Sequence, residues 1–572
     1  MRDRRQKLEL TWVGKEERPQ LEPRVLQEDA SLSHHAAARI SDRDQFENLL
    51  VQGDNLLALR ALEQKHAGSA ACVFIDPPYN TGSAFSHYDD GVEHSLWLSL
   101  MRPRLELLWA LLREDGALWI AIDDHEGHYL KVLCDELFGR RSFVSTVIWE
   151  NFYGRSNAAA ISPAHNYLLV YSPMGTDWRK VRRLLPRDEK SASKYANPDG
   201  DTRGRWRLGP IFAPEERHEG LMYTVETPSG RKISPPKGSH WRMPEDEFWK
   251  LVEDKRITFG DRGDNVPAIK LYLNEVQGGL VPRSLWPHSE VGHTQEARRE
   301  IQALFPGETP FATPKPERLL ERVIRISTGP GDLVVDSFAG SGTTGAVAHK
   351  MQRRWIMVEM GDHAITHVVP RLRQVVDGTD MGGVSKSLQW QGGGGFQFAR
   401  LAPSLLKRDK WGNWVVNSKK FNAELLAEAI CKLEGFTYAP DPRTFWIHGC
   451  STERDFLYVT TQNLSRAQLQ FISEEVGDDR TLLICCGSFR VKPDAFPNLT
   501  LKKIPQAVLH RCEWGRDDYS LNVEALPAAW DSGESNDGPA TKATSKKTKK
   551  KGRRGMQQLP LFDGKKQEEG GE

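Results

Sequence analysis

The feature that most constrains the fold is an apolar run that ends in a charged, proline-rich motif. Residues 71–75 are all apolar, which is typical of a strand buried on both faces of a parallel sheet. Four residues follow it directly, Asp76, Pro77, Pro78 and Tyr79. Ligands of open α/β sheets bind at the carboxyl ends of the strands. Because Asp and Pro are also common turn residues, the motif alone fits either a strand-ending turn or a catalytic site.

The groups of this motif suit a flat substrate that carries an amino group. The exocyclic amine of a nucleobase is a poor nucleophile, because its lone pair is delocalised into the ring. Asp76 and the carbonyl of Pro77 can accept both amino hydrogens, and the fixed φ of proline holds that carbonyl at a set angle. Tyr79 can stack on the ring, which typically contributes about 1–3 kcal/mol per base. The catalytic interpretation therefore predicts a nucleobase amine as the substrate group.

Length and composition bound the class of protein. The chain has 572 residues, and at roughly 100–200 residues per domain it should form three or four units. No stretch approaches the ~18 consecutive apolar residues of a membrane span, and the charged start has no apolar segment behind it. The seven cysteines form no CxxC pair and no zinc-like spacing. We therefore expect a cytoplasmic protein with reduced thiols, no metal site and no membrane segment.

The order of strand-like and helical segments predicts an α/β fold. From Leu49 to Tyr171, strand-like runs alternate with helical patterns, and helix–strand order returns at 315–372. The expected strands are 71–75, 117–122, 144–149 and 167–171, and the expected helices are 92–113 and 127–138. Such alternation predicts a parallel sheet with crossover helices.

Changes in composition suggest the domain boundaries. We expect an N-terminal arm (1–45), two halves of one α/β domain (46–172 and 313–380), an insertion (173–312), a C-terminal α/β domain (381–530) and a disordered tail (531–572). The glycine-rich stretch 381–397 is expected to be a hinge. In the C-terminal domain the strand-like runs are 456–461, 481–486 and 506–510.

A second constellation, residues 333–344, has the pattern of a strand, a glycine turn and a helix start. It lacks the Lys-Ser/Thr of a P-loop, and Gly340, Gly342 and Gly345 meet the dinucleotide fingerprint only in part. Glu359 ends a further strand-like run about twenty residues on, and an acid at that offset hydrogen-bonds ribose hydroxyls. The pattern favours a nucleoside site over its alternative, an ordinary turn followed by a surface glutamate.

The two motifs together resemble the amino-methyltransferases of DNA that use S-adenosylmethionine. The acid motif precedes the glycine motif, which is similar to the β-class order. Further segments resemble the modification (Mod) subunits of type III restriction–modification systems, namely 53–55, 80–82, 88–90, 95–105, 290–294 and 313–316. The resemblance spans about residues 46–372. It implies a Rossmann-like methyltransferase with a doubly wound sheet, an inserted target-recognition domain and a smaller C-terminal α/β domain.

The resemblance also implies roles for individual residues. Asp76, Pro77, Pro78 and Tyr79 would form the catalytic site. The cofactor would be held by Asp336, Phe338, Gly340, Gly342, Thr343 and Glu359, with Asp54, Lys315 and Pro316 at its methionine end. The chain departs from the family at Ser337, where proline is more common, and this should loosen the turn slightly without changing the chemistry.

The activity implied is methyl transfer to the N6 amine of adenine in DNA. The target base must leave the duplex, and residues 80–90, with Asn80, Phe85 and Tyr88, can close over it. Asp76 favours adenine, because related cytosine-N4 enzymes more often carry Ser there and protein-glutamine enzymes carry Asn. The alternatives are a cytosine-N4, RNA or protein-glutamine methyltransferase, and a non-catalytic DNA-binding specificity component.

Two basic segments suggest DNA as a partner. Residues 179–207 hold ten Lys or Arg against four acids, and Arg203, Arg205 and Arg207 are the candidate DNA contacts; the alternative is a solvated loop. In the tail, residues 542–554 hold eight Lys or Arg and no acid.

Just beyond the basic tail segment stand Gln558, Leu559, Pro560, Leu561 and Phe562, an apolar cluster in a polar stretch. It resembles the peptide that docks on the bacterial sliding clamp, and the alternative is a chance sequence. The partners expected are therefore double-stranded DNA, a restriction (helicase–nuclease) subunit, the sliding clamp and a second copy of the chain.

Overall fold

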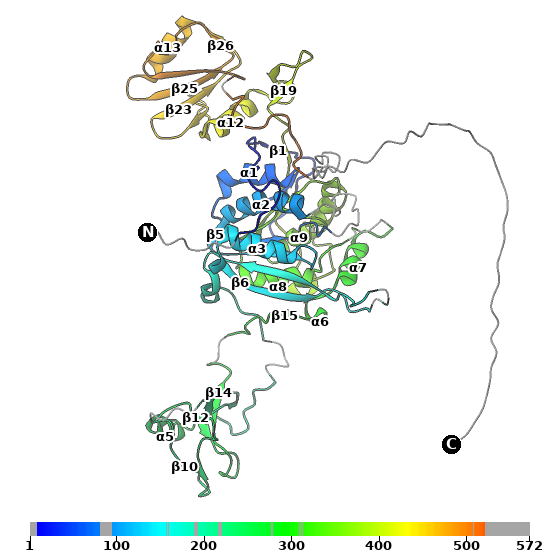
Figure 1. Cartoon of the computed structure of the whole chain (residues 1–572), viewed down its shortest axis with the longest axis vertical. Coiled ribbons are helices and arrows are strands. Elements are labelled where there is room, and N and C mark those ends of the chain that lie inside the picture. The colour runs from blue at the N-terminus through cyan, green and yellow to red at the C-terminus, as the bar shows by residue number, and fades with distance from the viewer. Residues whose placement is uncertain are drawn as a thin grey trace, which may run out of the picture. The chain divides into compact units, whose positions relative to one another are not determined.

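A large sheet with both parallel and antiparallel strands is the framework of the main domain, and its strands β1, β5, β6 and β15 are labelled in Figure 1. The computed structural model describes residues 9–80, 94–155, 157, 159–187, 193–215, 220–275, 278–307, 311, 313–492, 494–506 and 508–520. The sheet runs in the order β1 (Leu26–Glu28), β18 (Gly395–Leu401), β3 (Asn48–Gln52), β17 (Arg354–Glu359), β16 (Leu333–Asp336), β4 (Ala70–Ile75), β5 (Leu112–Ile122), β7 (His165–Tyr171), β6 (Phe143–Glu150) and β15 (Leu285–Trp286), and β2 (His34–His35) pairs with β18.

The expected parallel sheet is confirmed for its central strands, whereas β1 and β2 pair antiparallel with β18, and β7 is antiparallel to both of its neighbours. Strands β3, β17, β16, β4 and β5 pair parallel to their neighbours. β7 runs antiparallel to both β5 and β6, because the chain turns back after β6 with no crossover helix among the described residues of the connection. Parallel neighbours need such a crossover, whereas a short return connection makes an antiparallel pair.

Helices cover both faces of this sheet, as expected of a doubly wound fold. Along β4, Cys72 and Phe74 point into one core, and Val73 and Ile75 point into the other. One core is closed by α8 (Glu317–Ser327), α9 (Thr343–Lys350) and α10 (Val369–Val376). The other is closed by α1 (Asn55–His66), α2 (His94–Leu111) and α3 (Gly127–Phe138).

The strand order reverses between β4 and β16. From β4 the chain crosses through α2 to β5, and from β16 it crosses in the opposite direction through α9 to β17. The carboxyl ends of these two neighbouring strands therefore flank a crevice, which is the ligand-binding position in open α/β sheets. Asp76 follows β4, and the glycine turn follows β16.

Two of the expected boundaries are wrong. Residues 26–35 are not an arm, because β1 and β2 pair with β18 in the main sheet. The glycine-rich stretch is not a hinge. A Cβ added at Gly393 would lie 2.7 Å from Asp44 Oδ2, and one at Gly394 would lie 2.5 Å from the carbonyl of Gln45. The glycines thus allow the backbone to pack closely where β18 enters the sheet.

The insertion is shorter than expected, because the main sheet resumes at residue 285. There β15 pairs with β6, and α6 (His288–Val291) and α7 (Thr294–Leu304) follow. The insertion itself has its own core and is built from β8 (Trp206–Gly209), β14 (Ala268–Tyr272), β13 (Ile257–Thr258), β9 (Phe212–Pro214), β12 (Ser239–Trp241), β10 (Val225–Glu226), β11 (Lys232–Ile233) and α5 (Glu245–Glu253).

The C-terminal segment forms a smaller α/β domain. Its sheet is β21 (Thr437–Tyr438), β22 (Gly449–Cys450), β23 (Asp455–Val459), β25 (Thr481–Cys486) and β27 (Leu499–Lys503), flanked by α12 (Ala423–Glu434) and α13 (Arg466–Val476). The strand expected at 506–510 is absent from the described residues there; Val508 is buried in a turn instead, and β27 takes the place beside β25. Among the described helices, none combines the length and apolarity that a membrane crossing requires.

Candidate active site

The acid motif forms a compact group at the end of β4. Tyr79 Oη donates to Asp76 Oδ1 at 2.8 Å, and Lys315 forms an ion pair with Asp76 Oδ2. The ammonium of Lys315 also lies 5.3 Å from the centre of the Tyr79 ring. Burial and the charge of Asp76 raise the pKa of Tyr79 well above its ordinary value, so its hydroxyl stays protonated. The carboxylate is therefore held on both oxygens, and its side chain keeps 21% exposure.

Neighbouring elements fix the shape of this motif. Trp97, in α2, donates to the carbonyl of Pro78 at 2.7 Å. Asn80 has a φ of 58°, and its amide donates to Glu126 Oε1 at 2.7 Å. Asn166, at the start of β7, donates to Tyr79 Oη at 3.3 Å. Among the described residues, none hydrogen-bonds to the carbonyl of Pro77.

The glycine turn is ordered by the acids that flank it. Asp336 accepts from the N–H of Phe338 at 2.9 Å and from Thr344 Oγ1 at 2.5 Å. Burial raises the pKa of Asp336 to about 7. Gly342, which precedes α9, has a φ of 74°, and a Cβ there would lie 2.7 Å from Val368 Cγ1. Only glycine fits this position without strain.

Glu359, the last residue of β17, contacts the glycine turn from the neighbouring strand. Its carboxylate accepts from the N–H of Gly340 at 2.7 Å and from that of Gly361 at 3.0 Å, and it pairs with His363 at 3.1 Å. Burial opposes ionisation of Glu359, but these hydrogen bonds and His363 outweigh it and hold its pKa below the ordinary value. These contacts hold the buried carboxylate against the glycine turn.

One pocket joins the two motifs. Its lining includes Asp76 from the first motif and five of the expected cofactor residues, which are Lys315, Asp336, Phe338, Gly340 and Thr343. Segments more than 230 residues apart in sequence thus meet at the crevice between β4 and β16. The lining, which includes Phe338, the start of the glycine turn and the cation Lys315, fits a nucleoside with a charged amino-acid tail.

Four expected cofactor residues do not line this pocket, namely Asp54, Pro316, Gly342 and Glu359. Asp54 caps α1, where its Oδ1 accepts from the N–H of Leu56 at 2.9 Å, and its Oδ2 accepts from the N–H of Tyr519 at 2.9 Å. An acid directly before a helix is favoured in that capping role, so the assignment of Asp54 to the methionine end is corrected. Pro316 is the residue before α8, lies against Gly292 and does not line the pocket. Lys315, which was expected at the methionine end of the cofactor, does line the pocket and forms an ion pair with Asp76.

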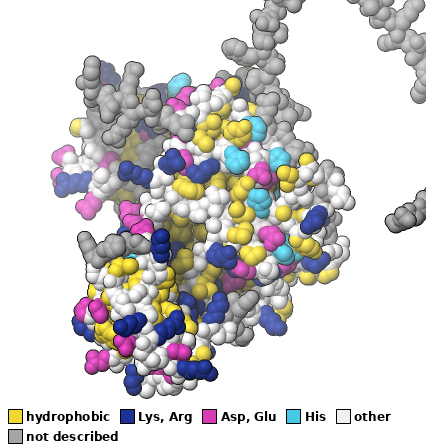
Figure 2. Space-filling view, turned by 60° about the horizontal axis from the view of Figure 1, so that its bottom comes forward, with side chains coloured by type: hydrophobic (Ala, Val, Ile, Leu, Met, Phe, Trp, Pro, Cys, Tyr) yellow, Lys and Arg dark blue, Asp and Glu magenta, His cyan; other side chains and the backbone are white. Residues whose placement is uncertain are grey.

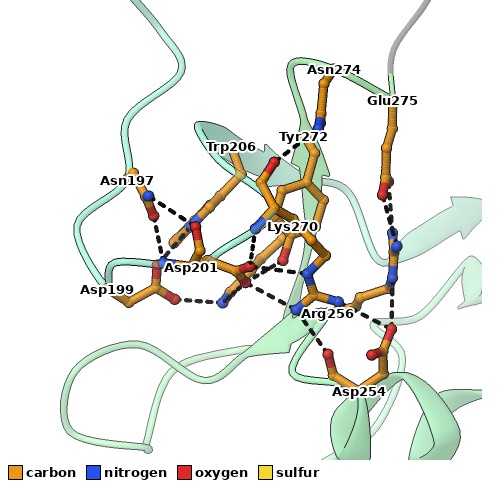
Figure 3. A network of polar contacts seen from close by, with 11 residues as sticks. Asn197, Asp199, Asp201, Trp206, Asp254, Arg256, Lys270, Tyr272, Asn274 and Glu275 are labelled. Atoms are coloured by element: carbon orange, nitrogen blue, oxygen red, sulfur yellow. Dashed lines mark hydrogen bonds and ion pairs between the residues drawn. The ribbon is translucent and has the colours of Figure 1, made fainter.

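The three candidate DNA arginines differ in their surroundings. Arg203 bonds Asp201 at 3.0 Å and Asp254 at 3.1 Å. Both acids belong to the polar network of the insertion that Figure 3 shows. Hydrogen bonds from Arg203 and Tyr272 hold the pKa of Asp201 well below its ordinary value. The structure thus corrects Arg203 to a residue that holds the insertion together. Arg207, in β8, and Arg205, directly before this strand, are exposed.

An exposed aromatic surface lies at the same sheet edge as the acid motif. Figure 2 shows a face of the protein on which histidine side chains gather among apolar ones. Tyr153, just beyond β6, is 58% exposed and stacks on His288 at 5.3 Å and against His293 at 5.1 Å. Glu150 accepts from the backbone N–H of His288 at 3.0 Å and holds that ring. Because β6 runs parallel to β4, these rings lie at the carboxyl edge of the sheet.

Two residues that hold the acid motif in place, Glu126 and Asn166, are not among the expected site residues. Glu126 follows a strand in an acidic run, which was the available signal for a polar group at the sheet edge. Asn166, which bonds Tyr79, carried no such signal. The expected lid residues Phe85 and Tyr88 and the clamp-like peptide at Gln558, Leu559, Leu561 and Phe562 lie outside the described residues.

Comparisons with known proteins agree with this geometry. Residues 70–369 match the family of DNA methylases. The chain is 30% identical over 427 residues to the probable type III restriction-modification enzyme HindVI Mod subunit of Haemophilus influenzae, covering 64% of this chain and 55% of that protein. It is 33% identical over 337 residues to the type III restriction-modification enzyme StyLTI Mod subunit of Salmonella typhimurium, with coverages of 53% and 50%. A more distant relative, the DNA adenine methyltransferase YhdJ of Escherichia coli, is 22% identical over 323 residues, with coverages of 56% and 82%.

The chain spans about half the length of these two Mod subunits. The family match begins at the first residue of β4 and ends at the first residue of α10. It therefore contains the acid motif, the glycine turn and Glu359. With more than half of its residues inside that match and both motifs in one pocket, the chain belongs to the family of DNA methylases, the N6 and N4 methyltransferases.

Proposed function

We propose that this protein transfers a methyl group to the N6 amine of an adenine flipped out of double-stranded DNA, with S-adenosylmethionine as the donor. The observation that carries the proposal is the single pocket in which Asp76 and the glycine turn meet. Asp76 favours adenine, as argued from the resemblance. DNA is the substrate that agrees with the family and with the exposed Arg205 and Arg207.

The acid motif acts on the amino group. Asp76 and the carbonyl of Pro77 accept its two hydrogens, which turns the nitrogen lone pair out of the ring and toward the cofactor side of the pocket. Tyr79 and Lys315 hold the carboxylate in place on both of its oxygens. Correct placement of the reacting groups is the main source of rate in such a transfer. Asp76 is then the nearest acceptor for the proton that the methylated nitrogen releases.

The glycine turn and its neighbours hold the cofactor, which supplies an electrophilic methyl group when bound. Phe338 and the backbone of Gly340 line its side of the pocket, and Glu359 offers acceptors to ribose hydroxyls. Lys315 lies where it can share its charge between Asp76 and the carboxylate of the donor. Burial raises the pKa of Asp336 to about 7, so at pH 7 this acid carries less negative charge beside Asp76 than an exposed aspartate would.

Loss of the catalytic acid tests the proposal. Purified wild type should transfer tritiated methyl from S-adenosylmethionine to plasmid DNA, and Asp76→Ala should abolish the transfer while keeping its thermal unfolding and cofactor binding. Asp377→Ala is the matched control, because Asp377 is a half-exposed acid that bonds only His34 among described residues. Undiminished transfer by Asp76→Ala would end the assignment.

The partners are part of the same proposal. The named relatives are Mod subunits of restriction–modification enzymes, so we propose a cytoplasmic protein that can assemble with a restriction subunit and with a second copy of itself. Light scattering of the purified chain, alone and with a co-expressed restriction subunit, tests both assemblies. We also propose that the peptide around Leu561 and Phe562 binds the sliding clamp. A tail peptide should bind purified clamp and lose binding in Leu561→Ala/Phe562→Ala, and no binding at high micromolar concentration would sink that idea.

A further inference from the structure

A cluster of four buried charges lies behind the cofactor side of the pocket. Glu317, Lys350, Arg371 and Asp380 are each at most 3% exposed. Lys350 pairs with Glu317 at 2.7 Å and with Asp380 at 2.7 Å, and Arg371 pairs with Glu317 at 2.8 Å. Two acids and two bases balance the charge. Removing one partner from such a cluster leaves an uncompensated buried charge, which is strongly destabilising.

Arg371 connects this cluster to the glycine turn. From α10 its Nη1 donates to the carbonyl of Ser341 at 3.1 Å and to Thr343 Oγ1 at 2.8 Å. Thr343 and Ser341 both line the pocket, whereas Arg371 does not. The planar guanidinium can hold the turn and Glu317 at the same time, and a lysine ammonium cannot reproduce that fork.

Glu317 connects the cluster to the catalytic side. It is the first residue of α8 and stands two residues after Lys315, which pairs with Asp76. Its second oxygen accepts from the N–H of Val384 at 3.0 Å. At Gly383, which has a φ of 52°, an added Cβ would run into the Glu317 carboxylate. The loop that contains Gly383 and Val384 therefore packs directly against the Glu317 carboxylate and restricts its position.

We propose that Arg371 is a positioning residue for cofactor binding, which sets the 340–343 turn against the start of α8 through Glu317. This inference rests on the proposed function, since it assumes that the pocket binds S-adenosylmethionine. A buried ion pair adds little net stability compared with apolar residues of similar size. The contribution of this cluster is therefore geometric: it fixes the distance between the two walls of the pocket before the cofactor arrives.

The test compares Arg371→Lys, which keeps the buried charge, with Arg373→Lys, a control on the same helix whose guanidinium bonds the carbonyl of Ser31 away from the pocket. Calorimetry on the full chain should show wild type binding S-adenosylmethionine and Arg371→Lys binding about tenfold more weakly. At saturating cofactor, kcat and the KM for DNA should stay within twofold of wild type. Hydrogen exchange of the unliganded variant should be faster at 338–345 and unchanged in β5.

The outcomes separate the two proposals. A wild type that binds no S-adenosylmethionine refutes the proposed function. A wild type that binds while Arg371→Lys binds equally well refutes the positioning role, as does a parallel loss of kcat, DNA affinity and cofactor affinity. If Arg371→Lys lacks a cooperative melt, Thr343→Val and Thr343→Ser decide the matter. The valine removes the acceptor for Arg371 and should weaken cofactor binding, and the serine keeps it and should restore binding. Equal affinity in both would overturn the inference.

Discussion

Tyr79 contributes two separable parts to the proposed chemistry. Its hydroxyl donates to Asp76 Oδ1 at 2.8 Å, and its ring stands beside the pocket. Tyr79→Phe removes the first part and keeps the second, whereas Tyr79→Ala removes both. In Tyr79→Phe, Lys315 still pairs with the other carboxylate oxygen of Asp76. The carboxylate should therefore be less well oriented but should stay in the site.

The size of the effect follows from the contacts. A hydrogen bond to a charged group contributes about 1.5–3 kcal/mol, and about 1.4 kcal/mol corresponds to a factor of ten in rate. With Lys315 remaining, we expect the low end, a fall of about tenfold in the kcat of Tyr79→Phe with the KM for DNA nearly unchanged. Loss of the ring in Tyr79→Ala removes base stacking of about 1–3 kcal/mol and should also raise that KM by at least about fivefold.

Steady-state methylation of a duplex oligonucleotide with tritiated S-adenosylmethionine measures both constants. The raised pKa of Tyr79 also predicts that wild type and Tyr79→Phe share the same alkaline pH profile, since the hydroxyl stays protonated. A Tyr79→Phe enzyme with the kcat of wild type would refute the orienting role. So would a variant whose only change is in the KM for DNA, because the ring alone would then explain the residue.

Three further perturbations test the framework. Gly342→Ala should weaken cofactor binding and lower stability by more than the ~1–2 kcal/mol of left-handed strain, because the new Cβ meets Val368; a urea midpoint equal to that of wild type would contradict this. Asp336 has a folded pKa raised from 3.8 to about 7, so its contribution to stability is fully present below pH 3.8 and is lost as pH rises to about 7; in Asp336→Asn that decline between pH 4 and 7 should shrink, and an unchanged profile of unfolding free energy would count against the buried acid. Arg205→Met should reduce the salt slope of DNA binding by about one at an unchanged melting temperature, whereas Arg203→Met should lower the melting temperature, and the reverse pattern would contradict their assignment.

The catalytic half of the site could be predicted because its signals are local. An uninterrupted apolar run can be a strand only if both faces are buried, and the residue that follows it then lies at the sheet edge. Asp76 and Gly340 were found in this way, and the structure brings both to one pocket. No local sequence pattern shows that β4 and β16 are neighbours in the sheet. The chemistry of the two motifs implies it, because the substrate amine and the methyl donor must meet.

The rest depended on contacts between distant segments. Three adjacent glycines suggest a hinge by composition, but their packing against Asp44 and Gln45 shows that they serve close approach. Arg203 stands in a basic segment, but it forms ion pairs with Asp201 and Asp254. A count of charges along the segment cannot show which acid pairs with which base. The resemblance assigns Asp54 to cofactor binding, but an acid directly before a helix is also favoured as a helix cap, and Asp54 caps α1. In each case a tertiary partner decided the function of the side chain.

The measurement that tests the central claim most directly is the identity of the methylated base. DNA from a host that expresses the wild-type chain, and from one that expresses Asp76→Ala, is digested to nucleosides and analysed by mass spectrometry, with single-molecule sequencing to locate the modified positions. The account predicts N6-methyladenine at one recurrent sequence context in the wild-type sample and none above background in the variant. N4-methylcytosine in its place, or N6-methyladenine that persists in Asp76→Ala, would contradict it.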